Sequence, residues 1–123
     1  MRILIVEDNV DVAQTLADLL DMDGYDDVAV AHDGTSGLTK VRDPVPDLVL
    51  CDIGLPGDID GFEFARRCRV DKTLDAARLV AMSGYGSDHD RTRAIEAGFD
   101  DLLAKPVRFE TLSELLRRVE GKL

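Results

Sequence analysis

The chain alternates between short apolar runs and longer segments in which apolar residues recur every three or four positions. A short apolar run bounded by turn formers is typical of a strand buried on both faces of a sheet. Such runs predict strands at residues 2–6, 27–31, 48–52, 78–82 and 101–104. The third run is the clearest, because four apolar residues lead directly into Asp52 and are followed by Gly54 and Pro56.

Helical periodicity fills the segments between these runs, and cap residues mark several helix ends. Asn9 is the expected N-cap of the first helix and Gly24 its stop. Ser87, with Asp90 three residues later, resembles a capping box that opens the fourth helix. Residues 109–119 predict an amphipathic closing helix. Five alternations with short connections predict an α/β fold with one doubly wound, five-stranded parallel sheet and helices on both faces.

Length and composition fit one globular domain spanning residues 1–123, and we expect no output domain. No apolar run approaches the roughly 20 residues of a membrane span, and residues 1–8 reach acidic positions too early for a signal peptide. We therefore expect a soluble, cytoplasmic protein with no membrane partner. A net charge of −10 also argues against nucleic acid as a partner. Cys51 and Cys68 are expected to be free thiols in the core.

The candidate chemistry lies where the predicted strands end. Glu7 and Asp8 follow the first strand, and Asp52 ends the third. Ser83 follows the fourth strand and Lys105 follows the fifth. Because parallel strands of such a sheet end at one edge, we expect these five residues to lie close together.

Three carboxylates at one edge repel one another unless a cation lies between them. Oxygen ligands favour magnesium or calcium, and an ion with few protein ligands keeps several waters, as Mg²⁺ does. The alternative is a set of solvated loop acids. Lys105 offers a positive charge to a bound anion, and Ser83 offers a hydroxyl. A carboxylate nucleophile, a divalent ion, a hydroxyl and a lysine together suit transfer of a phosphoryl group to Asp52.

Over its whole length the chain resembles the receiver domain of two-component response regulators, the CheY-like family. The matching blocks are residues 3–9, 46–56, 60–61, 81–84, 97–100 and 105–106. It is similar to the receivers of hybrid histidine kinases and to single-domain response regulators. The resemblance implies the flavodoxin-like strand order 2-1-3-4-5.

The resemblance also implies a phosphorelay. Asp52 would accept a phosphoryl group from a phosphohistidine on a histidine kinase or a histidine phosphotransfer protein. Mg²⁺ would be held by Asp8, by Asp52, by Glu7 through water and by the Gly54 carbonyl. The phosphorylated domain would signal by binding a downstream protein, and would be no enzyme beyond assisting its own phosphorylation and dephosphorylation.

By the same resemblance, Ser83 and Lys105 would contact the phosphoryl oxygens, and Lys105–Pro106 would be a cis peptide bond. The chain departs from the family where an aromatic usually lies three residues before the lysine, because Leu102 is there. The loop at residues 56–61 is one residue longer than usual.

A third departure concerns the water that would attack the acyl phosphate. Gly54, two residues after Asp52, has no side chain to orient that water, so Tyr85 is expected to control the phosphoryl lifetime.

Three other functions fit parts of the sequence. A pseudo-receiver would serve as a docking module without phosphorylation, although each expected reactive residue is present. An aspartate-nucleophile phosphohydrolase would need a second acid two residues after Asp52, where Gly54 lies; Asp58 and Asp60 have the spacing, but they lie in a loop. A flavin-binding protein of similar strand order would need a phosphate loop where Glu7 repels phosphate.

Overall fold

A computed structural model describes residues 1–84 and 86–121 of the chain. Its centre is one parallel sheet of five strands in the order β2-β1-β3-β4-β5. The strands are β1 (Ile3–Val6), β2 (Val28–Ala31), β3 (Leu48–Asp52), β4 (Arg78–Ser83) and β5 (Asp101–Ala104). The doubly wound α/β fold and the strand order expected from the sequence are confirmed.

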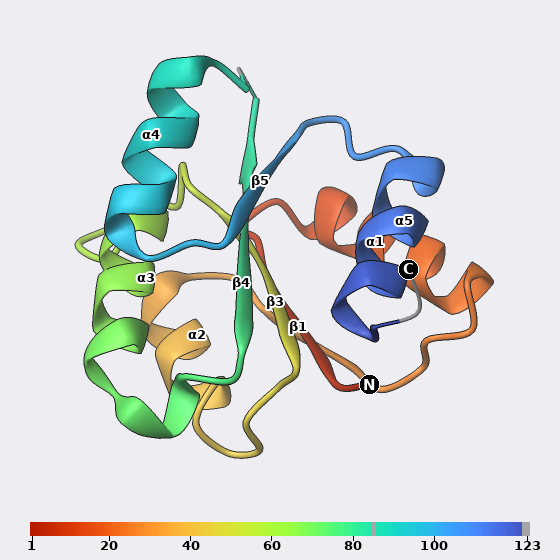
Figure 1. Ribbon diagram of the computed structural model, residues 1–123, viewed down its shortest axis with the longest axis horizontal. Helices are drawn as coiled ribbons and strands as arrows, with labels where there is room; N and C mark the ends of the chain where they lie inside the picture. Colours follow the sequence, from red (N-terminus) through yellow and green to blue (C-terminus); the bar gives the residue numbers. More distant parts are fainter. Residues whose placement is uncertain (85, 122–123) are drawn as a thin grey trace.

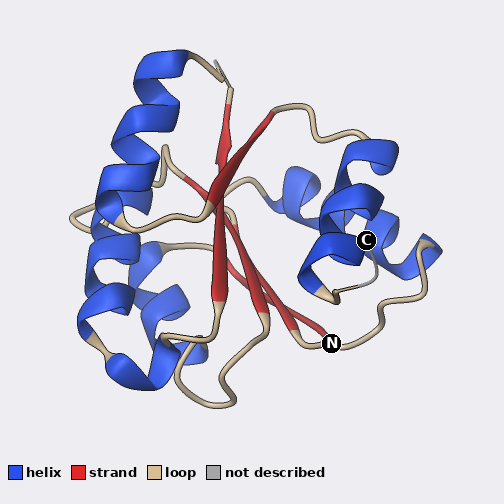
Figure 2. Ribbon diagram, viewed as in Figure 1, coloured by secondary structure: helices blue, strands red, loops and turns tan. Residues whose placement is uncertain are grey.

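Helices cover both faces of the sheet, as Figures 1 and 2 show. The helices are α1 (Val10–Met22), α2 (Gly34–Lys40), α3 (Gly61–Val70), α4 (Asp88–Ala97) and α5 (Phe109–Val119), with a 3-10 turn, η1 (Lys72–Leu74), before β4. α1 and α5 pack on one face, and α2, α3 and α4 pack on the other. Within the described residues, no helix combines the length and apolar character that a bilayer crossing requires.

The predicted cap residues mark the helix ends. The Asn9 side chain accepts hydrogen bonds from the first turn of α1, and Gly24 follows that helix with φ +89°. The Ser87 hydroxyl accepts from the Asp90 N–H at 3.1 Å, which is one half of the predicted capping box. The Asp90 carboxylate forms a different bond, described below.

Strand alternation divides the core into two clusters. Side chains such as Ile5 and Leu50 pack with α1 and α5, whereas their neighbours, such as Val49, pack with α2, α3 and α4. The two cysteines also lie on the second side, where both are free and buried, as predicted. Burial raises the pKa of the Cys51 thiol well above its usual value, so this thiol is held in its unreactive protonated form.

The same alternation sets the direction of the residues at the strand ends. Glu7, Asp52 and Lys105 continue the positions that face α1 and α5, each two residues after a member of that cluster. Ser83 instead follows Leu79 and Ala81, which belong to the cluster on the α4 side. The reactive edge therefore draws its side chains from both faces of the sheet.

Candidate functional site

The strand register places the predicted acids beside one another. β1 pairs with β3 up to Val6 and Cys51, so Glu7 and Asp52 follow at the next position on adjacent strands. Glu7 is 1% exposed and Asp52 is 8% exposed, whereas Asp8 is exposed to solvent. One carboxylate oxygen from each of the three residues lies within 4.8 Å of the others.

The cluster of three carboxylates fits a hard divalent cation. Its donors are all oxygens, two of its members are buried, and the exposed Asp8 leaves a side open to water. Magnesium prefers oxygen ligands and keeps part of its water shell, so the three acids suit it better than they suit a softer metal.

Lys105 closes the site from β5. Its Nζ lies 2.5 Å from Glu7 Oε1 and 3.3 Å from Asp52 Oδ2. Burial raises the pKa of Glu7, and the Asp52 charge adds to the rise, while the Lys105 hydrogen bond partly offsets it. Burial alone would lower the pKa of Lys105, but the Glu7 hydrogen bond and the Asp52 charge more than offset this and raise it. The lysine is therefore held as a cation at the acids.

The chain after β3 turns closely around Asp52. The Gly54 N–H donates to Asp52 Oδ1 at 3.0 Å, which fixes the carboxylate. Gly61 lies behind it, because a Cβ there would lie 2.4 Å from Ile53 Cα and 2.5 Å from the Asp52 carbonyl oxygen. Because Gly54 has no side chain, its backbone amide makes the contact with the Asp52 carboxylate.

Neither acid of the loop at residues 56–61 has the surroundings of a nucleophile. Asp58 is exposed, and Asp60 is the N-cap of α3, where its Oδ1 accepts from the Glu63 N–H at 2.9 Å. Their spacing resembles that of a phosphohydrolase pair, but Asp60 is engaged in capping. This geometry disfavours the hydrolase alternative.

Ser83 lies at the same edge but is engaged elsewhere. It is 1% exposed, and its hydroxyl donates to Asp90 Oδ2 on α4 at 2.8 Å while accepting from the Gly86 N–H at 3.2 Å. Sequence reasoning assigned Asp90 only to the helix cap. The alternation of β4, which turns Ser83 toward α4, is the signal that would have pointed to this contact.

The remaining predicted positions lie around this centre. Leu102 is 4% exposed and packs in the core cluster on the α4 side. The Lys105–Pro106 peptide bond is cis. Tyr85, which was expected to shield the acyl phosphate, lies outside the described residues.

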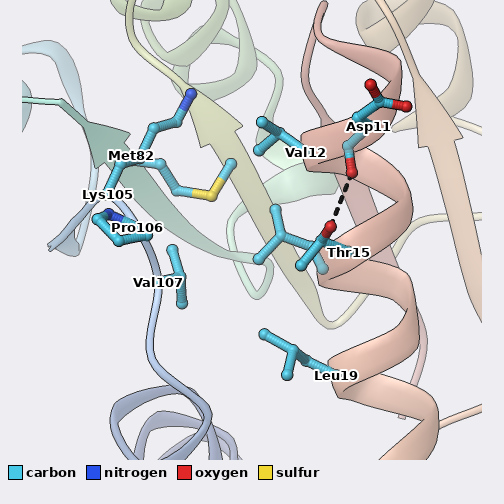
Figure 3. A pocket seen from close by; sticks show the side chains of 9 residues that line it. Asp11, Val12, Thr15, Leu19, Met82, Lys105, Pro106 and Val107 are labelled. Carbon is cyan, nitrogen blue, oxygen red and sulfur yellow. Dashed lines mark hydrogen bonds between the residues drawn. The ribbon is translucent and has the colours of Figure 1, made fainter.

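A groove of about 450 Å³ opens beside the site between α1 and the segment after β5. Figure 3 shows Val12 and Leu19 of α1 across from Pro106 and Val107. Lys105 lines the same groove, so an apolar surface runs up to the charged centre.

A parallel α/β sheet whose carboxyl edge joins three acids, a lysine and a hydroxyl has the layout of a receiver fold. A model of the response regulator receiver domain matches residues 3–117, and the chain therefore belongs to this family of two-component signalling domains. Receiver domains take phosphoryl groups from histidine kinases and bind Mg²⁺ in their active site. The match indicates no enzyme family.

Curated relatives are longer than this chain. It is 38% identical over 122 residues to the DNA-binding response regulator MtrA of Mycolicibacterium paratuberculosis, covering 99% of this chain and 51% of MtrA. It is 31% identical over 120 residues to the phosphate regulon transcriptional regulatory protein PhoB of Escherichia coli, covering 98% of this chain and 50% of PhoB. The chain thus spans about half the length of these relatives.

Solved structures share the whole fold. A putative response regulator from Chloroflexus aurantiacus matches with a TM-score of 0.90 and 30% identity, covering 98% of this chain and 97% of that one. The receiver domain of the sensor histidine kinase PA1611 from Pseudomonas aeruginosa matches with a TM-score of 0.88 and 29% identity, with the same coverage. That structure holds a magnesium ion in its active site cleft.

Proposed function

We propose that this receiver domain carries its phosphoryl group on Asp52. The observation that supports the assignment best is that both oxygens of the Asp52 carboxylate have a partner. One oxygen accepts from the Gly54 N–H at 3.0 Å and the other lies 3.3 Å from Lys105 Nζ. A nucleophile fixed in this way attacks with little loss of orientational freedom.

The transfer proceeds from a phosphohistidine on a partner protein. A carboxylate oxygen of Asp52 forms a bond to phosphorus as the bond between phosphorus and the imidazole nitrogen breaks, and the imidazole leaves with its electron pair. Lys105 then donates to the phosphoryl oxygens, and Ser83 supplies a second donor once its hydroxyl turns to them. The product is an acyl phosphate on Asp52.

Glu7, Asp8 and Asp52, with the Gly54 carbonyl, would hold Mg²⁺. When bound, the ion neutralises negative charge on the carboxylates and on the phosphoryl oxygens. The acids perform a second task, because Glu7 keeps the Lys105 cation at the site through its 2.5 Å contact.

The partner docks in the groove between α1 and the segment after β5. Lys105 lines both the groove and the reactive centre, so a helix lying along Val12, Leu19 and Val107 would bring its histidine to the edge where Asp52 lies. The occupant is therefore an amphipathic helix that carries the phosphohistidine, on a histidine kinase or a phosphotransfer protein. The downstream partner then distinguishes the phosphorylated domain by the roughly −1.5 to −2 of charge added at Asp52.

Incubation with acetyl phosphate and magnesium, followed by intact mass measurement, tests the assignment. The wild type should gain one phosphoryl group and Asp52→Asn should gain none. Asp58→Asn, which changes an exposed acid in the next loop, should label like the wild type. Failure of the wild type to label would favour a docking module that works without phosphorylation, and labelling of Asp52→Asn would place the acceptor elsewhere.

A further inference from the structure

The Ser83 hydroxyl is tied to helix α4 by a contact that the phosphoryl chemistry does not explain. Ser83 is buried at the end of β4, and its Oγ donates to Oδ2 of Asp90 at 2.8 Å. Asp90 is the third residue of α4 and is partly exposed. The bond joins a strand end at the reactive edge to the first turn of a helix on one face of the sheet.

A serine hydroxyl has one hydrogen to donate. The oxygens of a phosphoryl group on Asp52 are acceptors that need a donor, and a carboxylate such as that of Asp90 is a strong competing acceptor. Ser83 cannot give its hydrogen to both groups. We propose that Asp90 is a positioning residue that competes with the phosphoryl group for the Ser83 hydroxyl and so restrains the active state. This inference rests on the proposed function of Asp52.

The local structure of α4 provides a second position for the Asp90 carboxylate. Ser87 is the N-cap of α4, and its hydroxyl accepts from the Asp90 N–H at 3.1 Å. In a complete capping box, the carboxylate three residues later accepts from the N–H of the cap residue. When Ser83 turns away, Asp90 can complete this box, and a negative charge is favourable at a helix N-terminus. The exchange of partners therefore leaves Asp90 paired.

The same exchange carries the signal to the neighbouring strand. Arg91, the next residue of α4, binds Asp101 Oδ1 at 3.0 Å and the Leu102 carbonyl at 3.4 Å on β5. The side chain of Leu102 is apolar and packed in the core, so it cannot form a hydrogen bond that changes when the Ser83 hydroxyl turns. In this chain Asp90 links the state of the hydroxyl to the first turn of α4, and Arg91 links that turn to β5.

Binding of beryllofluoride, a phosphoryl mimic, in the presence of magnesium tests the competition by fluorine NMR titration. Asp90→Ala should tighten the Kd about fivefold, the value of one modest hydrogen bond. Asp90→Asn, which keeps an acceptor without charge, should lie between it and the wild type. Asp88→Ala is the matched control, because it removes an exposed acid from the same helical turn and should stay within about twofold of the wild type.

The decisive comparison is made in a Ser83→Ala background. There the Asp90→Ala change should no longer alter the Kd, because the competing bond is already lost. In the wild type, beryllofluoride should also slow amide hydrogen exchange at Ser87, because its N–H then donates to the released Asp90 carboxylate, and Asp90→Ala should show no such slowing.

Two results would overturn the competition alone: an unchanged Kd in Asp90→Ala, or a tightening that persists without Ser83, which would mark plain charge repulsion. A wild type that binds no beryllofluoride would overturn the proposed function along with it.

Discussion

The two helices that flank the reactive edge, α5 and α4, bury apolar side chains of different size. On one side of the sheet, α5 buries Leu112, Leu115 and Leu116, and Lys105 forms ion pairs with both Glu7 and Asp52. On the other side, α4 buries Ala94 and Ala97 in its contact with the core. Burial of a leucine side chain contributes about 1.5–3 kcal/mol, and alanine contributes much less. The charged centre thus lies on the firmly packed side, while the hydroxyl is tied to the helix that is easier to move.

This difference assigns chemistry and response to separate faces of one sheet. Changes on the α1 and α5 side should alter whether a phosphoryl group is accepted, and changes around Asp90 should alter how firmly the accepted group is held. Substitutions that test this division follow in order of expected effect.

Replacing Lys105 should damage the chemistry most. Lys105→Met removes the cation 3.3 Å from Asp52 and should slow labelling by acetyl phosphate roughly a hundredfold, the usual scale for one preorganised donor. Mg²⁺ binding, measured by calorimetry, should become tighter, because the ammonium no longer competes for Glu7. Lys72→Met, which changes an exposed residue of the 3-10 turn, is the control and should change neither quantity. Unchanged labelling in Lys105→Met would remove the lysine from the phosphoryl site.

Gly61→Ala should test how tightly the chain closes behind Asp52. A methyl group there meets backbone atoms at 2.4 and 2.5 Å, so we expect a loss of about 2 kcal/mol in the free energy of unfolding, together with slower labelling. Gly84→Ala is a matched control in another loop, because its φ is not positive and a Cβ meets nothing within 4 Å. Urea denaturation measures both variants, and equal stabilities would contradict the close approach.

Leu19→Glu should separate docking from chemistry. The charge enters the apolar groove and should slow transfer from a phosphohistidine protein roughly tenfold, the effect of about 1.4 kcal/mol. Labelling by acetyl phosphate, which needs no docking surface, should stay unchanged. Met22→Glu lies on the same helix but is already 71% exposed, and it should affect neither reaction. A loss of both activities in Leu19→Glu would indicate a damaged fold instead.

Tyr25→Phe should have the smallest effect and should leave labelling intact. The Tyr25 hydroxyl donates to Glu120 after α5, and its loss should lower the free energy of unfolding by about 1 kcal/mol at neutral pH.

The effect of Tyr25 should also depend on pH. Burial, with the Glu120 hydrogen bond and charge, raises the pKa of Tyr25 from 10.0 to about 12. The folded-state pKa is raised, so this contribution is complete below pH 10 and is lost as the pH rises through about 12. Unfolding curves of both variants at neutral pH and near pH 11 check this, and a gap that widens with pH would contradict it.

Most of the fold could be predicted because the signals are local. Apolar runs bounded by turn formers marked the strands, and Asn9 and Gly24 marked the limits of α1 as observed. The strand ends also predicted the neighbours Glu7, Asp8, Asp52 and Lys105, because a parallel sheet brings those positions to one edge.

What sequence reasoning missed depends on contacts between distant elements. Asp90 matched a local cap, and its choice of Ser83 depends on which way β4 turns its last side chain. The 3-10 turn η1 and the cis bond at Asp43–Pro44 were also not foreseen, because neither has a periodic pattern.

The loop at residues 56–61 indicates where this domain should tolerate an insertion. Gly57, at φ +87° with open space around it, takes up the turn, while Pro56 and Asp58 beside it are exposed. Beyond it, Ile59 fits against Gly34 so closely that a Cβ there would lie 2.4 Å from the Ile59 carbonyl oxygen. Buried Leu55 and the closely fitted Ile59 anchor the two ends of the loop, and residues 56–58 between them are exposed. We therefore expect residues 56–58 to accept an inserted peptide tag or sensor segment without a shift of Asp52.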